Sequence, residues 1–307
     1  MGSNWRLASK KRALETRAAA INGIRKFFQG HGYLEVETPF RIPAPAPESH
    51  IDAIPADGWF LHTSPELCMK RMLAAGYPRI FQLCHCWRQG ERGRRHISEF
   101  TMLEWYRAGA DYNGLMDETE ELVCSVAYHV TRRKTLLYEG NRVSLARPWQ
   151  RINVAEAYGR HAGVSPEQAL NAGTFDELMV RDIEPHLGFE RPSFLYDYPA
   201  VRGSLARLRA DDSSVAERFE LYIAGLEVAN GFSELVDPGE QRRRFEEEEA
   251  YRRSLGKHPY AVADKFLEEL ADMPPSAGIA LGVDRLVMLL QDAETIDDVV
   301  AFTPEEL

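Results

Sequence analysis

The hydrophobic pattern near the beginning of the chain predicts a long amphipathic helix over residues 9–30. Its apolar stripe, with the spacing of one helix face, is formed by Leu14, Ala18, Ile21, Ile24 and Phe28. The helix is expected to end at His31-Gly32. Residues 33–39 then predict a strand that stops at Pro39, because proline cannot continue a hydrogen-bonded ladder.

The rest of the chain divides into further predicted strands and helices. Strands are expected at 59–63, 79–88, 99–107, 194–200, 218–223 and 226–234, and from residue 278. Helices are expected at 64–72, 114–133, 239–256 and 263–271, and after the last strand. The remaining segments predict a loop at 41–58, a hairpin at 136–150 and a helical insertion at about 153–190. Runs of strands with helices outside them predict an α+β fold, an antiparallel sheet flanked by helices.

Composition and charge describe an ordinary globular protein. Hydrophobic residues make up 44% of the 307 residues and charged residues 27%, with no apolar run of about eighteen residues. The first six residues hold no apolar stretch typical of a signal peptide, so we expect a cytoplasmic protein with no membrane partner. A net charge of −10 argues against a broad nucleic-acid surface, which needs a basic stripe.

Cysteines and charge clusters carry little further signal. Four cysteines are too few and too scattered for a disulfide framework. Cys84 and Cys86 alternate along a predicted strand and point the same way; with no second pair and no His at finger spacing, core packing is favoured over zinc binding. The arginines at 242–244, 252 and 253 flank glutamates at 246–249, which predicts a solvated helix with ion pairs on its surface.

Two arginines stand in patterns that suit phosphate binding. Arg88 ends one predicted strand before an arginine-rich loop, and Arg285 heads the helix that follows a glycine-containing strand. A guanidinium stays charged and binds phosphate oxygens bidentately, and Phe100 offers a ring on which adenine could stack. A lone arginine on a strand is usually a surface ion-pair partner. Two in ordered frames favour a site that positions ATP for attack by a carboxylate.

Three glutamates, Glu220, Glu227 and Glu234, lie seven residues apart in a mostly apolar stretch. A tight turn at 224–225 would place Tyr222 opposite Glu227, with Glu220 diagonal to Glu227 on the same face. Two carboxylates so placed could share divalent cations that bridge ATP phosphates. From the spacing alone, it is equally consistent that one or both glutamates are outward-facing strand residues without a metal.

The frames around the two arginines closely resemble motifs 2 and 3 of class II aminoacyl-tRNA synthetases, in their lysyl version. The frames read Phe81-Gln82-Leu83-Cys84-His85-Cys86-Trp87-Arg88, Glu99-Phe100-Thr101-Met102-Leu103-Glu104-Trp105-Tyr106 and Gly278-Ile279-Ala280-Leu281-Gly282-Val283-Asp284-Arg285-Leu286. Residues 9–39 resemble motif 1, which builds the dimer interface, and residues 230–235 match the lysyl stretch Asn-Gly-Phe-Ser-Glu-Leu. The resemblance implies ATP, Mg2+, a homodimer and one catalytic domain over 1–307, without an anticodon-binding domain.

The same resemblance implies the candidate site residues. Arg88 and Arg285 are the implied catalytic residues. ATP binding is implied for Arg88, Glu91, Arg95, His96, Phe100, Glu227, Val228, Gly282 and Arg285. Substrate binding is implied for Ser64, Pro65, Glu66, Glu104, Tyr106, Asn230, Phe232, Glu234 and Ala280. The implied magnesium ligands are Glu220 and Glu227.

The implied substrate pocket is rich in carboxylates. Glu234 would face the side-chain ammonium of lysine with Tyr106 as its hydrogen-bonding partner, and Glu66 would take the other amino group. Glu104, two residues before Tyr106, would brace the pocket. Several carboxylates with no balancing cation predict a diamine substrate, lysine or an isomer of it.

Only a short segment precedes motif 1, and in this layout the chain resembles compact ligases that attach (R)-β-lysine to a lysine of elongation factor P. Trp105 and Ala280 are typical of that subgroup, and an acidic acceptor protein would replace tRNA, so tRNA is an unlikely partner. Motif 2 departs from the family at Gln89-Gly90 and at Ile97, and Glu91 could substitute by a one-residue shift. Two alternatives stay open: an activating enzyme with a tRNA or small-amine acceptor, and a catalytically inactive regulatory paralogue.

Overall fold

A computed structural model describes residues 5–307 of the chain. The first four residues, part of the segment from which the absence of a signal peptide was predicted, lie outside the described residues. Within residues 5–307, every helix is too short or too polar to cross a membrane.

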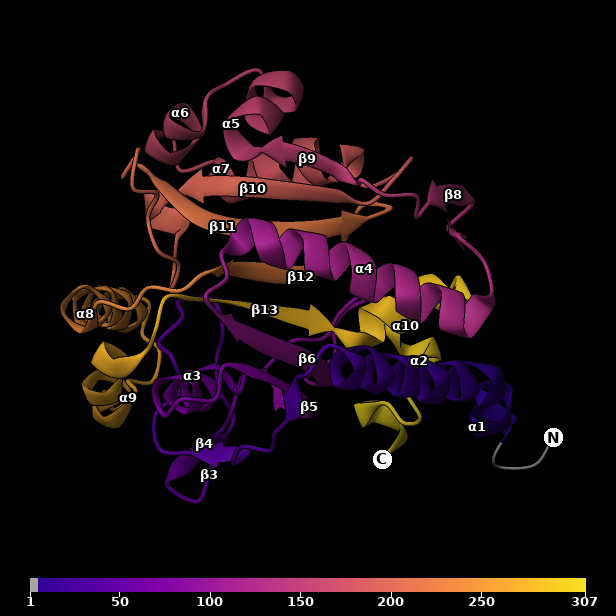
Figure 1. The fold of residues 1–307 in the computed structure, drawn as a ribbon, viewed down its shortest axis with the longest axis horizontal. Coiled ribbons are helices and arrows are strands. Elements are labelled where there is room, and N and C mark those ends of the chain that lie inside the picture. Colours follow the sequence, from indigo (N-terminus) through magenta and orange to yellow (C-terminus); the bar gives the residue numbers. More distant parts are fainter. Residues whose placement is uncertain (1–4) are drawn as a thin grey trace.

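A large sheet forms the centre of the molecule (Figure 1). Its eight strands, in spatial order, are β1 (Leu34–Glu35), β5 (Arg79–Trp87), β6 (Glu99–Ala108), β13 (Ser276–Gly282), β12 (Leu226–Ser233), β11 (Val215–Ile223), β10 (Ser193–Pro199) and β9 (Gln150–Asn153). Neighbours are antiparallel except β1 with β5 and β9 with β10, which are parallel. The predicted antiparallel sheet is confirmed.

The two faces of this sheet carry different side chains. Successive side chains of a strand point to opposite faces, so each strand contributes to both. On β6, Leu103 and Trp105 belong to the main hydrophobic core and are fully buried. Glu104 and Tyr106, at the alternate positions, line a cavity on the other face. One face therefore supplies the core that stabilises the fold, and the other supplies a candidate site.

Helices cover both faces. The core face packs against α2 (Lys11–Gly30), α4 (Tyr112–Thr131) and α10 (Val283–Gln291). A short helix, α1 (Trp5–Ser9), precedes α2. A second core joins the cavity side to α3 (Glu66–Ala74), α8 (Pro238–Ser254) and α9 (Asp264–Glu269). The expected helix at 9–30 is confirmed over α2, which begins at Lys11. Ile24 and Phe28 of its predicted stripe enter the main core, whereas Ala18 is exposed.

The predicted helical region at 153–190 contains α5 (Val154–Ala157), α6 (Pro166–Asn171) and α7 (Phe175–Leu178), joined by short π and 3-10 turns. Together with β10 they form a separate apolar cluster beside the large sheet. The predicted hairpin is β7 (Thr135–Tyr138) with β8 (Asn141–Ser144). Its turn at Glu139-Gly140 has both residues at positive φ, as a two-residue hairpin turn requires.

Three expectations from sequence are wrong in detail. Residues 33–39 form a strand only over β1, and the expected loop at 41–58 contains β2 (Arg41–Ile42) and β3 (Pro55–Ala56). Both pair with β4 (Trp59–Leu61) in a small second sheet. Strands of two residues are too short to show a hydrophobic period, so the sequence did not predict this sheet. On α8, Arg252 is fully buried rather than solvated, because it donates to the carbonyl oxygens of Glu48 and Ile51 and pairs with Asp52.

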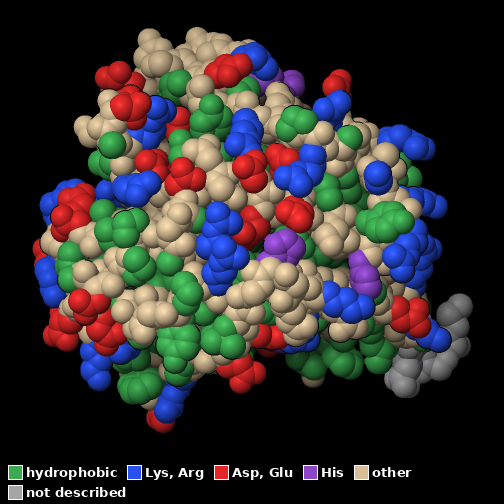
Figure 2. Space-filling view, viewed as in Figure 1, with side chains coloured by type: hydrophobic (Ala, Val, Ile, Leu, Met, Phe, Trp, Pro, Cys, Tyr) green, Lys and Arg blue, Asp and Glu red, His purple; other side chains and the backbone are tan. Residues whose placement is uncertain are grey.

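The surface carries no single extended patch of charge on the face seen in Figure 2, where Lys and Arg side chains alternate with Asp and Glu. On α8, Arg243 pairs with Glu240 and Glu247, so the predicted surface ion pairs are confirmed there.

Candidate active site

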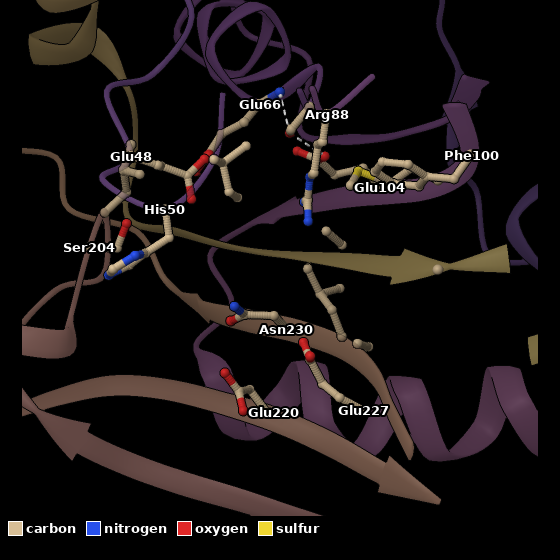
Figure 3. A pocket seen from close by; sticks show the side chains of 18 of the residues that line it. Glu48, His50, Glu66, Arg88, Phe100, Glu104, Ser204, Glu220, Glu227 and Asn230 are labelled. Carbon is tan, nitrogen blue, oxygen red and sulfur yellow. Dashed lines mark hydrogen bonds between the residues drawn. The ribbon is translucent and has the colours of Figure 1, made fainter. Parts of the chain in front are cut away.

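A cavity of about 460 Å3 opens on the sheet face opposite the main core. This volume lies within the range of about 300–1,000 Å3 typical of small-molecule sites. All of the site residues implied by sequence line it except Pro65 and Glu234. The structure thus brings together the beginning of α3, the strands β6, β11, β12 and β13, and the first turn of α10. Figure 3 shows Glu66, Arg88 and Glu104 on one side of the cavity and Glu220 and Glu227 on the other.

Arg88 leaves the end of β5 and extends into the cavity (Figure 3). Its guanidinium lies 5.0 Å from the centre of the Phe100 ring, and Glu91 lies 3.6 Å from its Nη1 atom. The Nε atom of Arg88 is buried and has no hydrogen-bond partner among residues 5–307. Because a buried donor without a partner is costly, this nitrogen points to an anionic ligand in the cavity.

Arg285 lies in the first turn of α10, where the backbone N–H groups of a helix also favour anions. Its Nη1 donates to the carbonyl oxygen of Glu227 at 2.8 Å, and its Nη2 lies 2.7 Å from His96 Nε2. Burial, followed by the charge of Arg285, lowers the pKa of His96, so this ring is neutral and accepts the hydrogen bond. The Arg-rich loop and α10 are thereby held together at one end of the cavity.

Glu220 and Glu227 come from the β11–β12 hairpin. Tyr222 pairs with Glu227 as predicted, since Ala224 and Gly225 form a tight turn with positive φ. A β-bulge between Leu221 and Tyr222 then shifts the register, so that Glu220 pairs with Asn230. Both carboxylates still line the cavity, which favours the shared-cation reading over two outward-facing strand residues.

The Glu220 carboxylate is held by three donors. Tyr198 and Tyr222 donate their hydroxyls to its Oε2 atom at 2.6 and 2.7 Å, and Arg218 donates to Oε1 at 2.6 Å. Burial raises the pKa of Glu220 while Arg218 opposes the rise and the charge of Glu227 adds to it. Two carboxylates that repel each other in a half-buried setting are hard oxygen ligands suited to Mg2+. The donor set therefore fits the divalent cation implied by sequence.

A third carboxylate, Glu184, approaches this pair from the helical region at 153–190. Burial, followed by the charges of Glu227 and Glu220, raises its pKa to about 7. Its Oε1 atom lies 3.4 Å from the Tyr222 hydroxyl. No motif around Glu184 marked it in the sequence, because its proximity depends on how the peripheral helices pack on β10.

At the other end of the cavity, Glu104 and Glu66 present carboxyl groups from β6 and α3. Ser64 donates its hydroxyl to Glu104 Oε2 at 2.6 Å and accepts from the backbone N–H of Glu66 at 3.0 Å. Tyr106 donates to Glu104 Oε1. Burial, followed by the charge of Glu66, raises the pKa of Glu104 to about 8. Pro65 itself caps α3 and lies outside the cavity lining.

The sequence-based expectation for Glu234 is wrong in two respects. Tyr106 pairs with Glu104 rather than Glu234, because those two residues share one face of β6. Glu234 is instead paired with Lys70, one helical turn beyond Glu66 on α3. Lys70 Nζ lies 2.6 Å from both Glu234 Oε2 and Glu66 Oε1, so the pocket does have a balancing cation. Burial raises the pKa of Glu234, and the charge of Lys70 opposes this rise.

Comparison with known proteins agrees with this geometry. The profile of the family described as tRNA synthetases class II (D, K and N) matches residues 4–306. The chain belongs to this family. A protein of Erwinia tasmaniensis, named elongation factor P--(R)-beta-lysine ligase, is 37% identical over 98% of both chains. Proteins of the same name from Salmonella typhi and Proteus mirabilis are 38% and 36% identical, with 98% of this chain and 98% and 97% of theirs covered. The class II catalytic fold predicted from the two arginine frames is thereby confirmed.

Several residues that shape the cavity escaped the sequence analysis. Lys70, Arg218, Tyr198 and Tyr222 each hold a cavity carboxylate, and Glu48 also lines the cavity. Burial raises the pKa of Glu48 to about 7. The one available signal was a lysine four residues after Glu66, the spacing of an ion pair along a helix.

Proposed function

We propose that this chain is an ATP-dependent ligase that activates (R)-β-lysine as an adenylate and transfers it to a lysine side chain of elongation factor P. The observation that carries the proposal is that one cavity holds both guanidinium and carboxyl groups. Two guanidinium groups, Arg88 and Arg285, serve phosphates, while the carboxyl groups of Glu66 and Glu104 serve amino groups. Arg88 lies on the same side of the cavity as Glu66 and Glu104, so a substrate whose amino groups meet these carboxyl groups would hold its own carboxylate beside the phosphates that Arg88 binds. The names and the full-length coverage of the relatives supply the substrate and the acceptor.

In the activation step, a carboxylate oxygen of the amino acid attacks the α-phosphorus and pyrophosphate leaves. Negative charge develops on the phosphate oxygens, and fixed cationic donors stabilise it without reorganising. Arg88 has a free buried donor for this purpose, and Arg285 is held against His96 and Glu227. Glu91 lines the cavity beside Arg88, which supports its replacing the acidic residue that motif 2 lacks at Gln89-Gly90.

Glu220 and Glu227 would hold Mg2+, which supplies charge neutralisation for the phosphates when bound. Arg218 and the two tyrosine hydroxyls fix the Glu220 carboxylate in position. Their contribution is orientation, since a side chain held by three donors cannot rotate away from the cavity.

Recognition of the diamine falls to Glu66 and Glu104. A raised pKa keeps the Glu104 carboxyl protonated near neutral pH in the ligand-free chain. An ammonium group brought beside it favours the ionised form, so substrate binding is coupled to proton release. Glu234 stands behind this pair and acts through Lys70, holding the Glu66 carboxylate where it is.

In the transfer step, the amine of the acceptor lysine attacks the carbonyl carbon of the adenylate, AMP leaves, and the amine loses a proton. We assign this role to a protein acceptor rather than tRNA, in keeping with the acidic chain. We also propose a two-fold homodimer built by α2 and β1. β1 is the edge of the large sheet, and Leu34 on it is half exposed. Sedimentation analysis of the purified chain tests the dimer.

The deciding experiment is intact-mass analysis of elongation factor P after incubation with the chain, ATP, Mg2+ and one lysine isomer at a time. We expect a mass gain of one lysyl unit, largest with (R)-β-lysine. The variant Arg285→Ala supplies an inactive control, and Arg94→Ala, an exposed arginine of the neighbouring loop, a matched active one.

Each other result contradicts a defined part of the proposal. Pyrophosphate release without a mass gain would overturn the acceptor and leave the activating chemistry, and a parallel reaction with tRNA would then identify it. No pyrophosphate with any isomer would overturn the enzymatic proposal as a whole.

A further inference from the structure

Beside the cavity, on the same face of the large sheet, three metal-binding side chains converge that no part of the proposed reaction uses. His62 follows β4, while Cys84 and Cys86 alternate along β5 and so point to the same side of the sheet. We propose that His62, Cys84 and Cys86 form a binding site for a thiophilic metal ion with a filled d shell, Zn2+ or Cu+. The site is structural and lies within the protein interior.

The distances suit a single ion. Cys84 Sγ lies 3.9 Å from Cys86 Sγ, which lies 4.0 Å from His62 Nε2, and all three ligand atoms are within 4.8 Å of one another. Zinc binds cysteine sulfur at about 2.3 Å and histidine nitrogen at about 2.0–2.1 Å. Two sulfur ligands at that bond length and a tetrahedral angle are separated by about 3.8 Å. The cluster therefore already has the spacing that a bound ion imposes.

A third sulfur supplies the fourth ligand. Met102 lies opposite Cys84 in the β5–β6 ladder, and its Sδ atom is 3.8 Å from Cys86 Sγ. Thiolate and thioether ligands favour Cu+ and Zn2+ over the harder Mg2+. The four side chains are nearly or completely buried, and a site closed by four protein ligands is the structural kind.

Two polar groups in the same spot lack partners. The side-chain amide of Gln82, two residues before Cys84 on the same face, is almost fully buried with neither its oxygen nor its nitrogen hydrogen-bonded in the described chain. His62 Nδ1 is likewise buried and unpartnered within residues 5–307. Core packing alone gives no reason to place unpaired polar groups beside two thiols. The sequence concealed this cluster, because His62 lies far outside the spacing of a zinc finger from Cys84.

Binding has a proton requirement. His62 Nε2 lies 2.8 Å from the carbonyl oxygen of His85, so a neutral ring that donates there must move that proton to Nδ1 before Nε2 can bind a metal. The two thiols must ionise, and metal uptake releases their protons. The ion would then tie the end of β4 to β5 and β6, next to Met102 and Phe100, which line the cavity.

The test is metal binding by the purified full chain after treatment with a chelator. Zn2+ and Cu+ are each titrated against a chromophoric chelator, and Co2+ serves as a spectroscopic probe of thiolate ligation. We expect one equivalent bound by the native chain and by Cys124→Ser, whose thiol lies on α4 away from the cluster. Cys84→Ser and Cys86→Ser should each weaken binding at least about 100-fold, because even a group that only orients a ligand is worth about 10–100-fold.

His62→Gln keeps both thiols and covers the case in which a serine variant does not fold. It should retain thiolate-to-cobalt absorption of altered shape while losing at least about 10-fold in affinity. The proposal is overturned if the native chain binds no more metal than the Cys84→Ser/Cys86→Ser double variant. It is equally overturned if His62→Gln leaves both the affinity and the spectrum unchanged, since His62 would then not be a ligand and the three-residue site would not exist.

Discussion

Lys70 Nζ lies 2.6 Å from Glu234 Oε2, and both side chains are almost completely buried. The same ammonium reaches Glu66 Oε1 at 2.6 Å, so one cation from α3 neutralises carboxylates from the helix and from the residue after β12. A buried charge without a partner is strongly destabilising, whereas a pair with good geometry is tolerated. The carboxylate-rich end of the cavity is thus built around a cation that belongs to the protein.

Lys70→Met should lower the free energy of unfolding by about 3–5 kcal/mol, because it leaves two buried carboxyl groups uncompensated. Urea denaturation measures the change. Arg71→Met is the matched control, since Arg71 makes an exposed pair with Glu269 whose loss costs less than about 1 kcal/mol. If Lys70→Met unfolds like the control, the buried pair contributes nothing to stability and its assigned role fails.

Glu66→Gln should raise KM for the amino acid at least about 10-fold, because a hydrogen bond to a charged group is worth about 1.5–3 kcal/mol. KM for ATP should stay unchanged, since Glu66 lies at the other end of the cavity from the Arg285 cluster. ATP–pyrophosphate exchange with each substrate varied in turn gives both constants.

Glu91→Gln provides the opposite case for that assay. It lies beside Arg88 at 3.6 Å and should raise KM for ATP while sparing the amino acid. Equal effects of the two variants on both KM values would contradict the assignment of Glu66 to the amino acid and of Glu91 to ATP.

Arg285→Ala should reduce kcat/KM for ATP by about 100–1,000-fold, the loss expected for a preorganised donor to a charged transition state. Arg285→Lys should recover little of this, because an ammonium cannot reproduce the forked contacts to Glu227 and His96. The exchange assay measures both variants, and Arg94→Ala serves as the control. A loss smaller than about 10-fold in Arg285→Ala would remove this residue from the phosphate site.

The free energy of unfolding should fall as pH rises from about 4.5 to about 8, in part through Glu104. Burial, followed by the charge of Glu66, raises the pKa of this carboxyl from 4.5 to about 8. The folded chain therefore keeps a proton that the unfolded chain has released, and the stability linked to it is present below pH about 4.5 and lost toward pH 8.

Glu104→Gln cannot titrate and should flatten this decline in urea denaturation series between pH 5 and 8. Glu246→Gln, which changes an exposed carboxyl on α8, should leave the slope of the native chain. If the free energy of unfolding depends on pH in the same way in the native chain and in Glu104→Gln, burial does not raise the pKa of Glu104.

The sequence predicted the position of a side chain where strand alternation or a tight turn determines the direction in which that side chain points. Arg88, Glu104 and Tyr106 follow from strand alternation, and the turn at Ala224-Gly225 set Tyr222 opposite Glu227. Pairings between distant segments did not follow, because nothing local encodes them. Lys70 meets Glu234 only once α3 packs against β6, and Glu184 reaches Glu220 only through the packing of the peripheral helices.

Burial was the second quantity that the sequence could not supply. A charged run on α8 suggested a fully solvated helix, yet Arg252 turns inward to satisfy the carbonyl groups of the loop at 48–51. The same arginine-rich composition serves an exposed position at Arg243. Composition alone does not distinguish a surface ion pair from a buried loop anchor.

The alternation on β6 gives one short strand two kinds of vulnerability. Leu103 and Trp105 fill the interior beneath the helices, while Glu104 and Tyr106 face the cavity. Substitution of the first pair affects the main core alone, whereas substitution of the second alters the cavity and, at Tyr106, the second core as well. Deletion of one residue from this strand would exchange the positions that face the main core with those that face the cavity.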